Sequence, residues 1–172
     1  MNLKHNYLTL LISLFLIPNA QGAETIFLYK GTFSRTIEIE ELYKFKETKI
    51  PSNKLKNLMQ ITNQKEKDLY KILSYKIEVP LIPTSKLMNS KIGEVFLSRL
   101  SKIIHPNKIL NKNIGKKAIR SGIILGSYNN NQKINLINFL KEYPNKNVAI
   151  NLRGLSKALE KAESLKGLIE FF

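Results

Sequence analysis

Apolar and polar side chains alternate along the chain from Phe33 to Ile39, the two-residue period of a strand with one buried face. The preceding run from Thr25 to Tyr29 is β-branched and aromatic, and Lys30-Gly31-Thr32 separates the two runs. This pattern predicts a β-hairpin. Because two strands alone are marginally stable in water, we expect a third strand. Residues 148–152 alternate in the same way and are the predicted partner.

Between the hairpin and the predicted third strand, apolar residues recur at the three- and four-residue spacing of amphipathic helices. Ser52 and Ser90 stand where N-caps are expected, Asn63 with Glu66 forms a predicted capping box, and Pro106 is expected to end a helix. The predicted apolar faces comprise Leu42 and Phe45; Leu55, Leu58 and Met59; Leu69, Ile72 and Leu73; Ile92, Val95, Phe96, Leu100 and Ile103; Ile119, Ile123 and Ile124; Leu136, Phe139, Leu140 and Tyr143, before Pro144; and Leu155, Leu159, Ala162 and Leu165.

The predicted fold class is therefore α+β and mainly helical, with an N-terminal β-hairpin and a later short strand packed with about six or seven short helices. No segment of the chain has the composition of a linker, so residues 23–172 are expected to form a single helical α+β domain.

Residues 1–22 have the pattern of a secretory signal peptide. Lys4 precedes an apolar run from Leu8 to Ile17, and Ala20 and Gly22 are the small residues that a signal peptidase reads. The run is shorter than the ~20 apolar residues of a spanning helix, and an uncleaved membrane anchor is the alternative. We expect export through the cytoplasmic membrane, to the periplasm, a thylakoid lumen or the external medium.

The composition of the 172-residue chain removes several kinds of chemistry. The chain has no cysteine, which excludes disulfides, cysteine-based zinc sites and thiol nucleophiles. No Gly-x-Ser-x-Gly elbow is present, and Gly126-Ser127 and Gly154-Leu155-Ser156 are the nearest fragments. His105 is interpreted as a helix C-terminal residue, favourable to the helix dipole. We therefore predict no catalytic residue, no metal ligand and no cofactor.

Positive charge is concentrated in one part of the chain. The formal net charge is +15, and residues 81–150 contain 12 Lys and Arg residues against Glu94 and Glu142. Such a cluster predicts contact with an anionic membrane surface or a polyanionic polysaccharide, whereas nucleic acid is not expected for an exported chain. The alternative is A/T-rich codon bias, because Lys far outnumbers Arg. The predicted anion-contact residues are Lys108, Lys112, Lys116, Lys117 and Arg120.

The order of these segments resembles a domain of unknown function found mostly in cyanobacteria. In that family the domain follows the signal peptide of exported alpha/beta hydrolases, and it also occurs alone. The resemblance implies that the chemistry belongs to a following hydrolase core, so no catalytic residue is carried over. The matching stretches are AETIFLYKGTFSRTIEIEELYKFKET, VPLIPTSKLMNSKIGEVFLSRLSKII, KKAIRSGIILGSYNNNQKINLINFLKEYPNKNVAINL and LSKALEKAE, anchored by Tyr29, Gly31, Phe33, Glu41-Leu42, Gly93-Glu94, Arg120, Phe139-Leu140 and Tyr143-Pro144.

Three functional hypotheses follow. The leading one is an exported, non-catalytic accessory or binding module that contacts a protein partner, a hydrolase on another chain or an envelope protein. The mostly apolar end from Leu168 to Phe172 is consistent with a contact surface, and packing of this segment on its own domain is the alternative. The second is an esterase-like hydrolase, or the remnant of one, whose core is missing or unrecognised. The third is electrostatic binding to an anionic membrane or polysaccharide.

Overall fold

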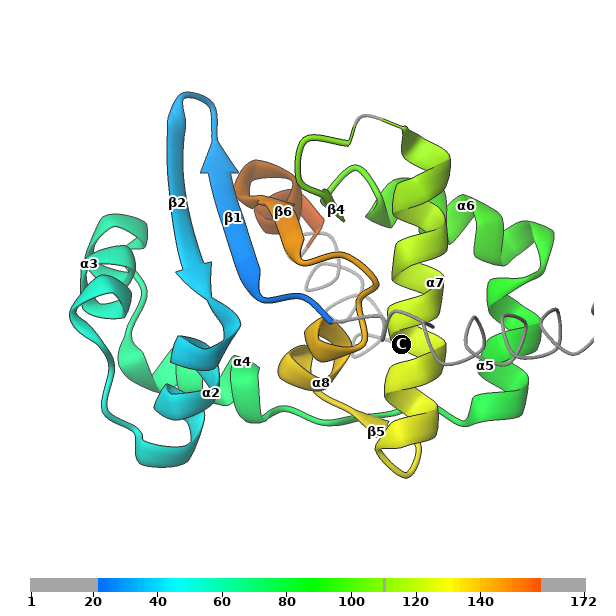
Figure 1. Cartoon of the computed structure of the whole chain (residues 1–172), viewed down its shortest axis with the longest axis horizontal. Helices are drawn as coiled ribbons and strands as arrows, with labels where there is room; N and C mark the ends of the chain where they lie inside the picture. The colour runs from blue at the N-terminus through cyan, green and yellow to red at the C-terminus, as the bar shows by residue number, and fades with distance from the viewer. Residues whose placement is uncertain (1–21, 110, 159–172) are drawn as a thin grey trace, which may run out of the picture.

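The computed structural model describes residues 22–109 and 111–158. In Figure 1, α2, α3 and α4 lie at one end of the molecule and α5, α6 and α7 at the other, with the sheet between them. The elements are β1 (Thr25–Lys30), β2 (Phe33–Glu38), α2 (Ile39–Thr48), α3 (Asn53–Thr62), α4 (Glu66–Ser74), β3 (Ile77–Glu78), α5 (Leu81–Met88), α6 (Lys91–Leu100), β4 (Ile104–Pro106), α7 (Lys112–Asn129), β5 (Lys133–Ile134), α8 (Leu136–Lys141), β6 (Asn147–Asn151) and a helix that begins at residue 152.

The main sheet has the strand order β2-β1-β6-β4. β1 and β2 form the predicted hairpin, and β6 confirms the predicted third strand by pairing in parallel with β1. Leu152, the last residue of the predicted strand, is instead the first residue of the following helix. Gly31 begins the two-residue hairpin turn with a φ of 62°, a left-handed conformation that glycine adopts without steric cost. A second, two-stranded sheet joins β3 to β5.

One face of the main sheet packs against the hydrophobic core. Ile26 pairs with Ile37 and with Val148, so these three side chains share a face, and all are buried. Apolar residues of all the helices from α2 to α8, with Ile134 of β5, complete the same core. Tyr143 is fully buried in it, and its ring meets the Phe139 ring edge-on at a centroid distance of 5.8 Å.

Two of the predicted caps are confirmed and one is wrong. The hydroxyl oxygens of Ser52 and Ser90 accept hydrogen bonds from the amides of Leu55 and Gly93, as N-caps do. Asn63 does not open a helix. It ends α3 in the left-handed conformation, and α4 begins after Lys65 with no side-chain cap.

The predictions around Pro106 are also corrected. α6 ends at Leu100, before the proline is reached, and Ile104–Pro106 form the edge strand β4 against β6. An edge strand tolerates proline because the missing N–H is not needed for the ladder. His105 is therefore a strand residue and not the C-terminal residue of a helix.

The observed fold class is α+β and mainly helical, as predicted. Within residues 22–109 and 111–158 there are seven helices from α2 to α8, and another covers residues 152–158. None of the helices in these ranges is both long and apolar enough to cross a bilayer. The predicted signal peptide lies outside the described residues except for Gly22, as do the apolar positions from Leu159 to Leu165 and the segment from Leu168 to Phe172.

Candidate functional site

The five predicted anion-contact residues lie on α7 and on the connection that precedes it. Lys108, Lys112 and Lys117 are exposed to solvent. Lys116 and Arg120 are half-buried and occupy successive turns of α7 facing α6. The structure thus separates the predicted cluster into three exposed lysines and two residues that make contacts within the fold.

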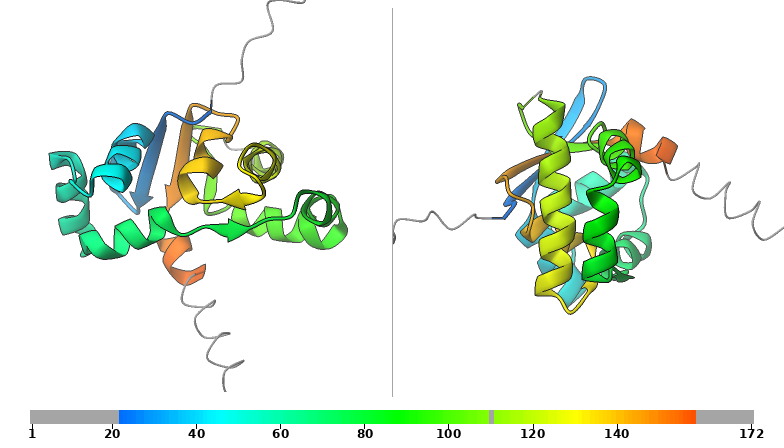
Figure 2. Two further views of the ribbon diagram at one scale, coloured as in Figure 1. Left: turned by 90° about the horizontal axis from the view of Figure 1, so that it is seen from below. Right: turned by 90° about the vertical axis from the view of Figure 1, so that its right-hand side faces the viewer.

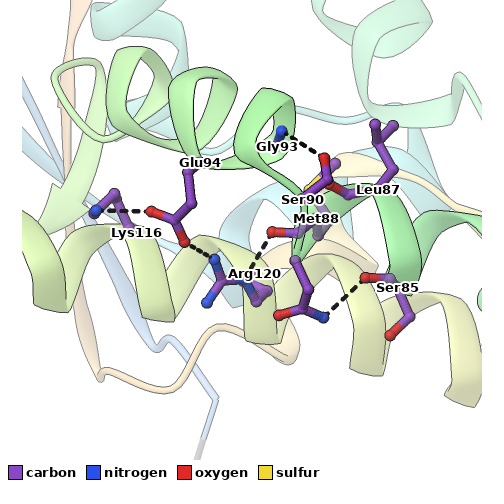
Figure 3. A network of polar contacts seen from close by, with 9 residues as sticks. Ser85, Leu87, Met88, Ser90, Gly93, Glu94, Lys116 and Arg120 are labelled. Carbon is purple, nitrogen blue, oxygen red and sulfur yellow. Dashed lines mark hydrogen bonds and ion pairs between the residues drawn. The ribbon is translucent and has the colours of Figure 1, made fainter.

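Lys116 and Arg120 both pair with Glu94 of α6 (Figure 3). The Lys116 ammonium lies 2.8 Å from one carboxylate oxygen of Glu94, and the Arg120 guanidinium bonds to the other oxygen. Hydrogen bonds from these two cations hold the pKa of the Glu94 carboxyl below its usual range. Two of the five predicted residues therefore have an internal carboxylate partner.

Arg120 also reaches the end of α5. Its Nε donates a hydrogen bond of 3.1 Å to the carbonyl oxygen of Met88, the last residue of α5. A carbonyl at a helix C-terminus has no partner within the helix and carries partial negative charge, so a guanidinium suits it. One arginine thus joins three helices, α5, α6 and α7.

Gly93 allows α5 and α6 to approach closely. A Cβ atom placed there would lie only 2.0 Å from the carbonyl oxygen of Leu87, so no other residue fits without a backbone shift. The Ser90 hydroxyl closes the same turn by donating to the Leu87 carbonyl at 2.7 Å. Helix packing therefore accounts for Gly93, Glu94 and Arg120, three of the residues that carry the resemblance noted in the sequence. We use the name helix clamp for the contacts of these three residues with Lys116, Leu87 and Met88.

The helix clamp fixes which face of α6 looks outward. Gly93 and Leu97 are buried, whereas Ile92, Val95 and Phe96 have exposed side chains. The predicted apolar face of this helix is consequently wrong for Ile92, Val95 and Phe96, which face solvent, whereas Leu100 is partly buried and packs against the core. The Gly93–Leu97 row, four residues apart and lacking charge, is the signal that could have shown the true inner face.

Tyr29 and His105 meet on the sheet face opposite the core. The Tyr29 hydroxyl lies 3.0 Å from His105 Nε2, and His105 Nδ1 lies 3.0 Å from the Pro106 carbonyl oxygen. A carbonyl only accepts hydrogen bonds, so Nδ1 carries the proton, and in the neutral ring Nε2 accepts from the tyrosine. The pair ties β1 to β4 across β6.

A family model described as alpha/beta hydrolase of unknown function (DUF1400) matches residues 22–151. The chain belongs to this family. The match runs from the first described residue to the end of β6, so it includes the main sheet and the helix clamp. No curated protein and no solved structure matches the chain.

The family description raises the question of whether a hydrolytic site is present. In hydrolases of this class a serine sits on a sharp turn between a strand and a helix. Ser127 instead lies inside α7, is fully buried, and donates a 2.5 Å hydrogen bond to the Val79 carbonyl. Ser156, in the helix that begins at residue 152, also has an interaction partner.

Ser127 and His105 are also too far apart to act together. A Cβ at Gly115 would lie 3.7 Å from the His105 Cβ, which places His105 beside the first turns of α7. Ser127 comes twelve residues later, about 18 Å along the helix at a rise of about 1.5 Å per residue. A nucleophile and its base must lie within hydrogen-bond reach.

In the described ranges, His, Asp and Glu side chains form no group of three that could hold a metal ion.

Proposed function

We propose that this chain is an exported, non-catalytic accessory or binding module. The observation that carries the proposal is the outward direction of the apolar residues of α6. Ile92, Val95 and Phe96 are exposed although they sit at helical spacing, and exposed apolar groups of this kind are characteristic of contact surfaces. The secretory pattern of residues 1–22 supports export.

The bonding of Ser127 and His105 supports a role without nucleophilic chemistry. Both residues make hydrogen bonds that hold secondary structure together, Ser127 to the residue after β3 and His105 to β1. A serine nucleophile needs an adjacent base that takes its proton, and the geometry around Ser127 supplies a carbonyl oxygen instead.

The second candidate is an esterase-like hydrolase or the remnant of one. Only the family description favours it, since that description names alpha/beta hydrolases. In this alternative the site would use Ser127 or Ser156 in an arrangement that differs from the one described above.

Labelling with a fluorophosphonate probe separates the two candidates, because the probe reacts with activated serines only. We expect the full chain to show no labelling and no hydrolysis of short-chain esters above the level of a heat-denatured sample. A serine esterase treated in parallel provides the positive control. Stoichiometric labelling that Ser127→Ala or Ser156→Ala abolishes would overturn the proposal in favour of the hydrolase.

A further inference from the structure

The outer surface of α6 combines apolar and basic side chains. Ile92, Val95 and Phe96 are 74%, 53% and 47% exposed, and Leu87 of α5, whose carbonyl oxygen lies beside Gly93, is 49% exposed. Lys91 and Arg99 are exposed on the same helix. We call these six residues the α6 outer face. α5 and α6 lie at one end of the molecule (Figures 1 and 2).

The helical spacing places the charges among the apolar groups. Lys91, Val95 and Arg99 follow one another at four-residue intervals and form one row along α6. Ile92 and Phe96 form the neighbouring row. Each apolar side chain of these two rows therefore lies beside a cation that can extend past it.

The one acidic residue of α5 and α6 is directed away from this surface. Glu94 points to α7, where Lys116 and Arg120 neutralise it. Among the described residues, no acidic side chain forms an ion pair with Lys91 or Arg99. Lys86 and Lys102 are also exposed at the two ends of the helix pair. The charged residues of the α6 outer face are thus all positive.

The helix clamp prevents the apolar residues from turning inward. Leu97 is fully buried, Gly93 packs against the Leu87 carbonyl, and Arg120 holds the end of α5. Rotating α6 to bury Phe96 would break all of these contacts and expose Leu97. The α6 outer face is therefore presented in a fixed conformation, which lowers the entropic cost of binding.

We propose that the α6 outer face docks on an anionic lipid bilayer. The apolar side chains enter the boundary between headgroups and acyl chains, and Lys91 and Arg99 extend to the lipid phosphates. A polyanionic polysaccharide would engage the cations but leaves the apolar side chains without a partner. A protein partner would have to be acidic and apolar together. This inference rests on the proposed binding role and names its target.

A tryptophan reporter tests the inference at the site itself, because the chain contains no tryptophan. Phe96→Trp in the full chain places the reporter on the α6 outer face, and Ile72→Trp, at an exposed position of α4, is the matched control. With vesicles of phosphatidylglycerol and phosphatidylcholine, we expect the emission of the Phe96→Trp variant to shift to the blue and to be quenched by brominated phospholipid. The emission of the Ile72→Trp variant should change little. Residues 1–22 are the same in both variants, so binding through them affects both equally.

Charge substitution provides the second measurement. Lys91→Gln with Arg99→Gln should lower the vesicle partition coefficient roughly 25-fold, since each basic residue near the surface contributes about 1 kcal/mol. Lys56→Gln with Lys71→Gln, exposed lysines of α3 and α4, should lower it much less. Raising the salt concentration should weaken binding of the unsubstituted chain.

The outcomes separate this inference from the proposed function. Equal quenching of the two tryptophan variants, or equal loss in the two charge variants, would overturn the lipid-docking face. Absence of vesicle binding would overturn it too, and a fluorophosphonate-negative chain would then remain a binding module with another target. If an envelope protein, and not lipid, shields the tryptophan of the Phe96→Trp variant, the face belongs to a protein partner and the bilayer is rejected.

Discussion

The two ends of the molecule are stabilised in different ways. At one end, α2, α3 and α4 contribute six buried apolar side chains to the core, whereas α5 and α6 at the other end contribute Met88 and Leu97. The α5–α6 pair is held instead by the helix clamp, in which one carboxylate, two cations and one glycine provide the close contacts. The comparison shows that a helix can have a strong apolar pattern and still direct that pattern to solvent.

The largest expected effect comes from matched phenylalanine substitutions in the two regions. Phe45 of α2 is 1% exposed, so Phe45→Ala should lower the free energy of unfolding by about 3–5 kcal/mol through lost burial and a cavity. Phe96→Ala on α6 should change it by less than about 0.5 kcal/mol. Urea denaturation of both variants measures the difference. Equal losses would mean that Phe96 is buried in solution.

A glycine substitution tests whether the α5–α6 pair depends on close backbone packing. Gly93→Ala should cost about 1–3 kcal/mol, because the new methyl group collides with the Leu87 carbonyl. Hydrogen exchange should show lost protection in α5 and α6 while β1 and β6 stay protected. Gly126→Ala is the control, since its methyl group meets only the flexible end of Ile134 at 3.2 Å. Uniform loss of protection across the chain would contradict the separation into two regions.

The smallest effect concerns the acid stability of the clamp. Because the pKa of Glu94 is lowered in the folded state, its ion pairs contribute stability above the ordinary carboxyl pKa of 4.5. That contribution is lost as the pH falls through the lowered pKa. Glu94→Gln should therefore be less stable than the unsubstituted chain near neutral pH, and the gap should close on acidification. Denaturant midpoints between about pH 3 and 7 measure it, with Glu78→Gln as an exposed control. A gap independent of pH would contradict the assignment.

The sequence predicted the main sheet better than the helix clamp for physical reasons. Alternation marks β2, where Ile37 is buried and Thr36 and Glu38 are exposed, and it also marks β6, whereas β-branched and aromatic composition marks β1. β4 was not predicted because a strand of three residues that includes a proline is too short to show alternation of apolar and polar residues. α5 was not predicted because proline usually breaks a helix, and this segment contains Pro83. The helix forms because Pro83 lies in its first turn, where proline is tolerated.

The candidate site was only partly predictable. The cluster of basic residues on α7 is visible in the sequence. The sequence does not show that Glu94 pairs with two of its members, because Glu94 and Arg120 are 26 residues apart and meet only in the folded chain. Periodicity likewise marks Ile92, Val95 and Phe96 as an apolar face without saying which way that face points. The resemblance to the family did single out Gly93, Glu94 and Arg120, and the structure gives the physical reason for them.

The parallel pairing of β1 with β6 has a consequence for how the chain reaches its fold. Thr25 and Asn147 are partners across 122 positions, and β1 lies between its early neighbour β2 and this late one. A growing chain can close the hairpin at once, but one edge of β1 stays unpaired until β6 has been synthesised. Contacts of such long sequence separation slow folding because the loop must be closed before they form. The sheet is thus completed only when nearly all of the matched region is available.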